Sequence, residues 1–275
     1  MVDLDAYLAR IDMPARPTLD AAGLARLQRA HRLAVPFENL DVRLGRPIAI
    51  DSAAVFAKIV GERRGGYCFE QNRLFLDALL ALGFDARPLL ARVWLGAGED
   101  DPAPPLTHTL SLVTLDGENW VADPGFGGSY APPMPLMDGA PAEAPDGARF
   151  RLEERAGGWM LWRDGPAATT DGRGTGEGWR QQYGFTLARV EDADLAMGNH
   201  WASTAPGTRF VTHTIVSLVL PHGFASLTDR HYRRRSGESA AEGMIADPRV
   251  YRMRLGLLFG IQLSAQEAER LFAEA

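Results

Sequence analysis

Residues 64–72, RGGYCFEQN, hold the single cysteine of the chain in a setting that favours reactivity. Gly65 and Gly66 permit a tight turn, and the periodic apolar residues after them predict a helix with Cys68 in its first turn. The unpaired N–H groups and positive dipole at a helix start favour a thiolate, and such sites lower a cysteine pKa to about 3.5–7.5. A buried structural cysteine is the alternative, but it predicts an apolar position in the middle of an element. We therefore interpret Cys68 as a nucleophile.

A cysteine nucleophile needs a base and a group that orients the base, and the fold brings them together. Among the six histidines, His31 lies on a predicted amphipathic helix, where it is packed or exposed. His213 lies in an alternating segment and is equally a core or a surface residue. His108 begins a predicted strand directly after a proline-rich loop, where active-site groups tend to be displayed. We therefore prefer His108 as the base.

Asp123 follows the next predicted strand and can reach His108 if the two strands form a hairpin. The pair Asp116-Gly117 between them is typical of a two-residue hairpin turn. Counted from the turn centre, His108 and Asp123 are offset by two residues, which keeps both side chains on one face. This diagonal separation allows a carboxylate–imidazole contact. The spacing supports a triad of Cys68, His108 and Asp123, although chance would also pair some His and Asp in this way.

Helices are expected mainly before residue 84, where apolar residues recur every three or four positions. Asp20 and Ser52 are expected to cap two of these helices, and Gly83 to end the one that begins near Cys68. Ser264, with Glu267 three residues later, predicts a last helix that starts with a capping box. The expected N-terminal helices cover residues 5–11, 21–33, 53–60 and 68–82.

Strand-like alternation replaces the helical period after residue 84. Residues 181–190 are ambiguous, and two loops are expected at 96–105, which is rich in proline and acids, and at 172–178, which is rich in glycine. The expected strands cover residues 88–95, 107–115, 120–122, 149–154, 159–163, 210–220 and 222–229. The order predicts a helical part, then a β-rich part, then a mixed part.

Composition narrows the class of protein. The 275 residues are 46% apolar and 23% charged, which argues against a disordered chain. The net charge of −6 disfavours nucleic acid as the partner. No apolar run is long enough for a membrane span, and acids near Met1 argue against a signal peptide, so we expect a cytoplasmic location. One cysteine closes no intrachain disulfide, and with the scattered histidines it suggests no metal site.

Residues 64–72 resemble the active-site signature of the arylamine N-acetyltransferases. Further pieces agree in the same order along the chain: residues 35–41 (VPFENLD), the His108 strand, Asp123 before Gly125–Gly127, and Asn199-His200 with Ser203-Thr204 before Phe210. The resemblance spans nearly the whole chain. It implies an α+β fold with a cysteine-protease-like triad of Cys68, His108 and Asp123. It also implies a helical bundle over 1–83, a β-barrel over 84–190 and an α/β lid over 191–275.

The resemblance implies transfer of an acetyl group from acetyl-coenzyme A to the nitrogen of arylamines, arylhydrazines or N-hydroxyarylamines, as in xenobiotic metabolism. The expected route is ping-pong, through an acetyl-cysteine at Cys68. Backbone N–H groups near Cys68, and those of residues 125–127, are candidates for stabilising the oxyanion. Phe37 and Phe126 are candidates for the acceptor pocket, and a plain core role is the alternative for either.

Gly127 and Gly128 are expected to allow close approach of the pantetheine arm of coenzyme A. A basic run is a candidate for the nucleotide phosphates, although a solvated charged turn is the preferred interpretation of it. Pro124 stands where the family commonly has a β-branched residue, and we expect it to be tolerated since the position is extended. The basic run consists of Arg230, Arg233, Arg234 and Arg235.

Three alternatives stay open. A macrolactam-forming amide synthase of polyketide biosynthesis resembles these transferases, and a cysteine hydrolase uses the same triad chemistry. A non-catalytic binding domain would keep the cleft and tolerate Cys68→Ala. The expected partners are a coenzyme A thioester and a small arylamine or hydrazine, with no nucleic acid or membrane, and a homodimer is also open.

Overall fold

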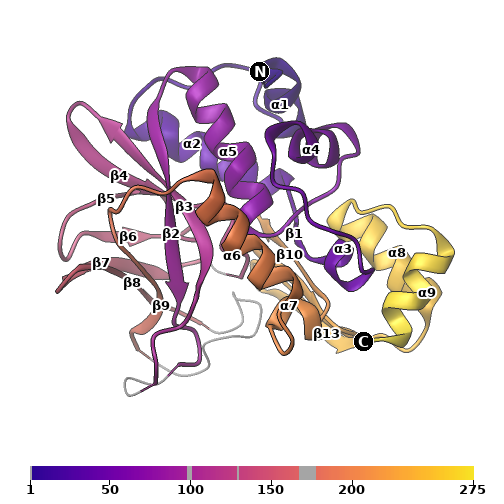
Figure 1. Ribbon diagram of the computed structural model, residues 1–275. Helices are drawn as coiled ribbons and strands as arrows, with labels where there is room; N and C mark the ends of the chain where they lie inside the picture. The colour runs from indigo at the N-terminus through magenta and orange to yellow at the C-terminus, as the bar shows by residue number, and fades with distance from the viewer. Residues whose placement is uncertain (1, 98–100, 129, 167–177) are drawn as a thin grey trace.

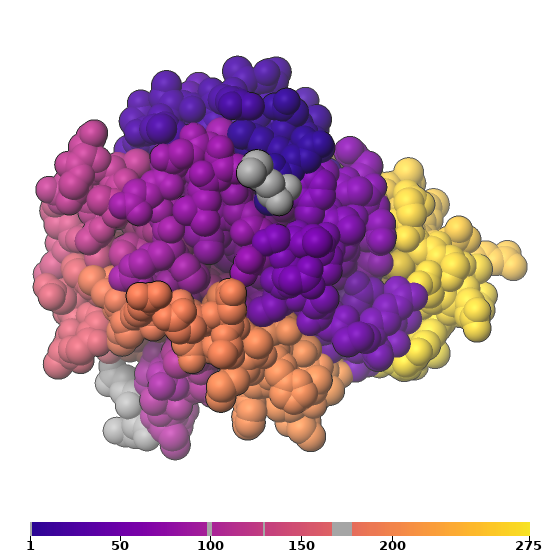
Figure 2. Space-filling model, turned by 45° about the horizontal axis from the view of Figure 1, so that its top comes forward, coloured from indigo at the N-terminus to yellow at the C-terminus, as the bar shows by residue number. Residues whose placement is uncertain are grey.

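Two antiparallel sheets and the helices around them make up the molecule (Figure 1). The computed structural model describes residues 2–97, 101–128, 130–166 and 178–275. Eight strands form a nearly closed barrel on one side, and the C-terminal helices lie on the other, with helix α5 between them. Figure 2 shows the N-terminal helices in indigo and the C-terminal helices in yellow on different sides of one body. The barrel and the helices confirm the expected α+β class.

The N-terminal helices begin and end largely where the sequence predicts. Asp20 caps α2, its carboxylate accepting the Gly23 N–H, and α5 ends at Gly83, whose φ is +100°. The expectation for Ser52 was wrong by one residue, because Asp51 accepts the Ala54 N–H and Ser52 is already helical. The helices are α1 Leu4–Arg10, α2 Ala21–Ala34, α3 Leu40–Arg43, α4 Ser52–Phe56 with the π-turn Ala57–Gly61, and α5 Cys68–Leu82.

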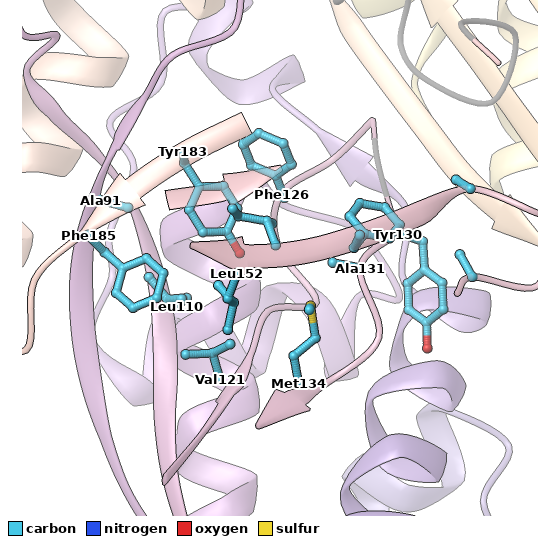
Figure 3. Close-up of a cluster of buried hydrophobic side chains, with 14 of the residues drawn as sticks. Ala91, Leu110, Val121, Phe126, Tyr130, Ala131, Met134, Leu152, Tyr183 and Phe185 are labelled. Atoms are coloured by element: carbon cyan, nitrogen blue, oxygen red, sulfur yellow. The ribbon is translucent and has the colours of Figure 1, made fainter. Parts of the chain in front are cut away.

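The barrel has the strand order β5-β4-β3-β2-β9-β8-β7-β6. Its apolar interior contains Tyr183, Phe126 and Leu152, which Figure 3 shows in one cluster. The ambiguous residues 181–190 are a strand only as far as Phe185. The strands are β2 Asp85–Val93, β3 Leu106–Leu115, β4 Glu118–Ala122, β5 Met134–Pro135, β6 Pro141–Glu143, β7 Arg149–Arg155, β8 Gly158–Asp164 and β9 Arg180–Phe185.

The second sheet connects the N-terminal and C-terminal parts of the chain, because β1 (Phe37–Glu38) pairs with β10 (Ile215–Leu220). The strand expected over 210–220 was wrong at its start. Thr208 has an extended backbone and its carbonyl accepts the N–H of Val211 and Thr212, which begins a short helix instead. The remaining elements are α6 Asp192–Thr204, α7 Arg209–Thr212, β11 Gly223–Thr228, β12 His231–Ser236, β13 Ser239–Met244, α8 Pro248–Phe259 and α9 Ala265–Ala273.

The β3–β4 hairpin has the predicted register. Asp116 and Gly117 both have positive φ (49° and 84°), as a type I′ turn requires. Ser111 pairs with Ala122, so His108 and Asp123 extend from the same face two residues apart. Of the two expected loops, residues 98–100 of the first and most of the second lie outside the described residues. No described helix is long and apolar enough to cross a membrane.

Candidate active site

Cys68 is the first residue of α5, and the turn before it leaves no room for side chains. A Cβ on Gly65 would lie 2.1 Å from the Pro36 carbonyl oxygen, so only glycine fits there. The Glu70 carboxylate accepts the Tyr67 N–H at 3.0 Å and closes the start of the helix. The Cys68 thiol points to strand β3, where it donates to the Thr107 carbonyl oxygen at 3.6 Å. The turn therefore holds the sulfur beside the residue that precedes His108.

His108 and Asp123 form a buried pair. His108 Nε2 lies 2.7 Å from Asp123 Oδ2, with the side chains 2% and 5% exposed. The other carboxylate oxygen, Oδ1, accepts from Asn72 Nδ2 at 3.0 Å and from the Gly125 N–H at 2.9 Å. Asp123 is thus fixed from three sides. Because Nε2 of His108 is engaged, Nδ1 is the ring nitrogen available for chemistry.

The ionisation of the site departs from one expectation. Burial, followed by the charge of Asp123, raises the pKa of the Cys68 thiol, and the backbone N–H of Phe69 opposes this more weakly. A helix start alone therefore does not make the thiolate here, which corrects the prediction of a lowered pKa. Burial acts to raise the pKa of Asp123, but His108 together with the hydrogen bonds of Asn72 and Tyr183 outweighs it, so the pKa of this carboxyl is lowered. Asp123 is consequently ionised, and a Cys68 thiolate requires transfer of its proton to a base.

Cys68 and His108 line one cavity of about 510 Å³. Phe37 and Phe126 line the same cavity, so the structure brings four of the predicted site residues to one space. Asp123 lies behind His108 and does not line it. The Phe126 ring packs edge-on to His108, with ring centroids 5.0 Å apart. The opposite wall comes from the C-terminal part, and includes Trp201, Ala202, Thr208, Arg209, Phe210, Thr212 and His213.

Gly127 and Gly128 do not line this cavity. Gly127 has φ +88°, and a Cβ there would lie 3.1 Å from the Phe37 ring. The backbone of Gly127 therefore packs closely against the Phe37 side chain. Arg32 binds the carbonyl oxygens of Pro124 and Gly127 at 2.9 and 3.0 Å and fixes the loop. The Gly125 N–H donates to Asp123, and this corrects its expected role with the oxyanion.

A buried cluster of charges ties the segment around Phe37 to the glycine turn. Arg64 lies 2.8 Å from Glu38, whose side chain is fully buried. Lys58 lies 2.7 Å from both Asp41 and Glu70. The backbone makes the same link, because the Glu38 N–H donates to the Gly66 carbonyl oxygen at 3.1 Å. These contacts fix Phe37, which lines the cavity, relative to Cys68.

Sequence reasoning missed the residues that hold the site together. Asn72 has a signal, since it lies one helical turn after Cys68 and faces the same side of α5. Gln28, which accepts the Asp123 N–H at 2.8 Å, has no local signal. Tyr183 has none either; its ring lies 4.9 Å from His108, and its hydroxyl is a hydrogen-bond partner of Asp123. In the described part of the chain, no three His, Cys, Asp or Glu side chains gather as metal ligands would.

Comparison with known proteins first gives the class. A family model described as N-acetyltransferase matches residues 20–268. The arylamine N-acetyltransferase / N-hydroxyarylamine O-acetyltransferase of Salmonella typhimurium is 37% identical, over 99% of this chain and 92% of the relative. The arylamine N-acetyltransferase of Mycolicibacterium smegmatis is 35% identical over 98% of both chains. The chain therefore belongs to the arylamine N-acetyltransferase family, and the resemblance inferred from the motifs is confirmed.

Solved structures share the whole fold. The arylamine N-acetyltransferase from Salmonella typhimurium superimposes with a TM-score of 0.90 at 32% identity and covers 100% of both chains. The Mycobacterium marinum enzyme in complex with coenzyme A gives 0.87 at 31% identity, covering 99% of this chain and 98% of that one. The barrel, the second sheet and the surrounding helices thus form the architecture of these enzymes.

Proposed function

We propose that this chain moves an acetyl group from acetyl-coenzyme A to the nitrogen of an arylamine by a ping-pong route. The observation that carries the proposal is the cavity that holds both Cys68 and His108, with Asp123 on the far nitrogen of the imidazole. The names of the relatives support the acceptor class. The coenzyme A complex of the Mycobacterium marinum enzyme supports the donor.

In the first half-reaction His108 Nδ1 takes the Cys68 proton, and Asp123 stabilises the imidazolium that forms. The thiolate attacks the carbonyl carbon of the thioester. Backbone N–H groups of Cys68 and Phe69, which already favour negative charge at this sulfur, stabilise the oxyanion. The tetrahedral intermediate collapses, the carbon–sulfur bond to coenzyme A breaks, and the departing thiolate takes the proton from His108. Acetyl-Cys68 and free coenzyme A result.

In the second half-reaction the amine attacks acetyl-Cys68, and His108 takes a proton from the amine nitrogen. Collapse breaks the carbon–sulfur bond, and the proton passes from His108 to the Cys68 sulfur. The aromatic rings of Phe37 and Phe126 form the apolar wall against which an aryl group packs. Arylhydrazines and N-hydroxyarylamines present a similarly placed nucleophile and belong to the same proposal.

The finer expectations about organisation are kept as part of this proposal. The division into 1–83, 84–190 and 191–275 places the nucleophile, the His–Asp pair and the opposite cavity wall in three successive parts. Close approach of pantetheine at Gly127 and Gly128 stays a prediction. So do a cytoplasmic location and the lack of nucleic-acid and membrane partners, which follow from the net charge of −6 and the sequence pattern. A homodimer stays open.

The test is an acyl-coenzyme A panel against arylamines and hydrazines, with release of free thiol and acetylated product both measured. We expect product only when donor and acceptor are both present, with parallel lines in double-reciprocal plots of initial rates. Rapid release of acetate without an acceptor would instead identify a hydrolase. Activity only on a long polyketide substrate that closes into a macrolactam would identify an amide synthase.

A further inference from the structure

His213 lines the active-site cavity from the C-terminal wall and takes no part in the chemistry proposed above. Its Nδ1 lies 2.8 Å from Asp229 Oδ2. Asp229 itself lies outside this first cavity and lines a second one on the C-terminal sheet. Two His–Asp pairs therefore present an imidazole to the active-site cavity, one from each wall.

The two pairs are built alike. In each, Oδ2 of the acid contacts an imidazole nitrogen, and Oδ1 accepts a backbone N–H at 2.9 Å, from Gly125 in the first pair and Thr214 in the second. They differ in exposure, since the side chain of His108 is 2% exposed and that of His213 is 47% exposed. The second pair is therefore placed to meet a molecule that enters from solvent.

Buried hydrogen bonds fix the backbone that carries His213. Asn39 Nδ2 donates to the carbonyl oxygens of Phe210 and His213 at 2.8 and 2.7 Å, and Asn39 Oδ1 accepts the Ile215 N–H at 2.7 Å. Asn39 is 2% exposed and directly follows β1, which carries Phe37. The imidazole of His213 is thus held at a set position relative to the aromatic part of the cavity.

The contact with Asp229 determines where the neutral imidazole carries its proton. An ionised carboxylate only accepts hydrogen bonds, so Nδ1 of His213 is the protonated nitrogen. Nε2 then has a lone pair, and no described residue is hydrogen-bonded to it. This nitrogen is a hydrogen-bond acceptor at the wall of the cavity.

The other polar side chains of this wall offer less to a ligand that donates a hydrogen bond. Thr208 and Thr212 donate their hydroxyl protons to carbonyl oxygens of their own segment, at 2.9 and 3.0 Å. Arg209 has donors only. In an otherwise largely apolar pocket, a few placed polar groups fix the orientation of a ligand. Nε2 of His213 is the imidazole acceptor that this wall supplies.

We propose that Nε2 of His213 accepts a hydrogen bond from a hydroxyl or second amino group of the acceptor, on the side of the ring away from the attacking nitrogen. The inference rests on the proposed function and names the acceptor class, which is aminophenols and arylenediamines. With the attacking nitrogen at Cys68 and the ring against Phe37 and Phe126, that substituent meets the C-terminal wall. Asp229 is a positioning residue, because it acts on the substrate only through the imidazole.

The experiment compares 4-aminophenol with 4-methoxyaniline, in which methylation removes the hydroxyl proton while the oxygen still donates electrons to the ring. The value of kcat/KM for each acceptor is measured with saturating acetyl-coenzyme A, in mildly alkaline buffer that keeps the imidazole neutral. We expect the wild type to prefer 4-aminophenol by about 3–10-fold, the usual value of one net hydrogen bond. Equal values for the two acceptors would overturn the assignment.

The variant His213→Phe keeps a ring and removes both nitrogens, so the ratio of the two kcat/KM values should fall to about 1. His222→Phe is the matched control, because His222 is exposed and does not line the cavity, and it should keep the wild-type ratio. A wild-type ratio in His213→Phe, or a lowered ratio in His222→Phe, would show that His213 does not recognise the hydroxyl group.

The variant Asp229→Asn tests the tautomer. Asparagine tolerates the positive φ of this position, 54°. Because the amide oxygen still accepts the Thr214 N–H, the amide NH₂ faces Nδ1 of His213 and donates to it, which moves the ring proton to Nε2. The ratio should therefore fall as in His213→Phe. A purely structural role of Asp229 would leave the ratio unchanged and overturn this part of the proposal.

A binding measurement on the unmodified protein separates this inference from the proposed function. In ¹⁵N NMR of histidine-labelled protein, the Nε2 resonance of His213, assigned by its absence in His213→Phe or His213→Gln, should shift with 4-aminophenol and not with 4-methoxyaniline. If it does so without any acetyl transfer, the recognition contact stands and the proposed function is wrong. If turnover is normal and the resonance responds equally to both acceptors, the contact is wrong and the function stands.

Discussion

The two walls of the active-site cavity are built in different ways. The wall of α5, β3 and β4 is buried, and its Asp123 carboxylate is hydrogen-bonded to His108, Asn72 and a backbone N–H. The opposite wall, from α6 to the start of β10, is only partly buried: its Trp201 is 52% exposed, whereas the neighbouring Ala202 is 2% exposed. We therefore expect the chemistry to depend on groups that cannot move without breaking buried hydrogen bonds, and recognition of the acceptor to depend on exposed side chains that can adjust.

This difference sets the sizes of the mutational effects. A change in the buried wall leaves an unpaired polar group in a dry site, which costs more than the bond itself. A change in the partly exposed wall only removes contact area that water can replace. We therefore expect losses of turnover or of stability from the first wall, and changes in KM from the second.

The largest effect is expected for Asp123→Asn. The amide keeps the shape but does not stabilise an imidazolium, so kcat/KM should fall on the order of 10³–10⁴-fold, as when the acid of a comparable triad is replaced. Steady-state rates with a fixed arylamine measure it. Asp116→Asn, in the exposed hairpin turn, is the control and should be near wild type. A loss below 10-fold for Asp123→Asn would remove the orienting role.

Glu38→Gln tests the buried charge cluster. It removes the charge of the nearer acid that pairs with the buried Arg64, at 2.8 Å, and leaves Asp41 at 3.4 Å as the other. The free energy of unfolding should therefore fall by about 1–3 kcal/mol. Urea titration followed by circular dichroism measures this loss. Asp5→Asn breaks an ion pair to Arg16 that is exposed on both sides, and should change stability by less than about 1 kcal/mol. Similar values for the two variants would contradict the contrast.

The pH dependence of stability tests His31, which is fully buried with Nδ1 3.0 Å from the Tyr7 hydroxyl. Burial, then the charges of Arg10 and Arg32, lower the pKa of His31 to about 3. The pKa of a histidine in an unfolded chain is about 6.5. Between about pH 6.5 and pH 3 the unfolded state therefore holds up to one more proton at this residue than the folded state. Stability should therefore fall as pH falls through this range, by up to about 1.4 kcal/mol per pH unit from this group.

The variant His31→Gln should lack that part of the slope when urea unfolding is compared at pH 7 and pH 5. His222→Gln, which changes an exposed histidine, should keep the wild-type slope. An unchanged slope in His31→Gln would show that His31 is not the group that titrates.

The smallest effect is expected in the partly exposed wall. Trp201→Ala should raise KM for a two-ring arylamine about 2–10-fold, the usual value of one aromatic contact, and leave kcat unchanged. Met197→Ala, on the same helix, is exposed outside the first cavity and serves as the control. A large drop in kcat for Trp201→Ala would mean that this wall also positions the chemistry.

Local patterns predicted where Cys68, His108 and Asp123 lie in the fold, because hairpin register and helix starts are local properties. Asp116-Gly117 determines the turn, and the turn determines that His108 and Asp123 share a face. Gly65 and Gly66 indicate a turn before α5, and the structure shows that a side chain at either position would meet another part of the chain.

The rest depends on contacts between distant segments, which periodicity does not reveal. Gln28 and Asp123 are 95 positions apart in the sequence. Strand β1 is only two residues long, and it forms by pairing with the distant strand β10. The pKa of Cys68 was misjudged for the same reason, since the helix start is visible in the sequence and the burial that outweighs it is not. The strands β12 and β13 were not expected from the sequence, because they carry charged or small residues and show little apolar alternation.

The most direct test is mass spectrometry of the protein after brief incubation with acetyl-coenzyme A alone. We expect one added acetyl group on the peptide that contains Cys68, its loss on addition of an arylamine, and no adduct in Cys68→Ala. Normal acetylation of arylamine without any adduct on Cys68, or an adduct that the amine does not remove, would contradict it.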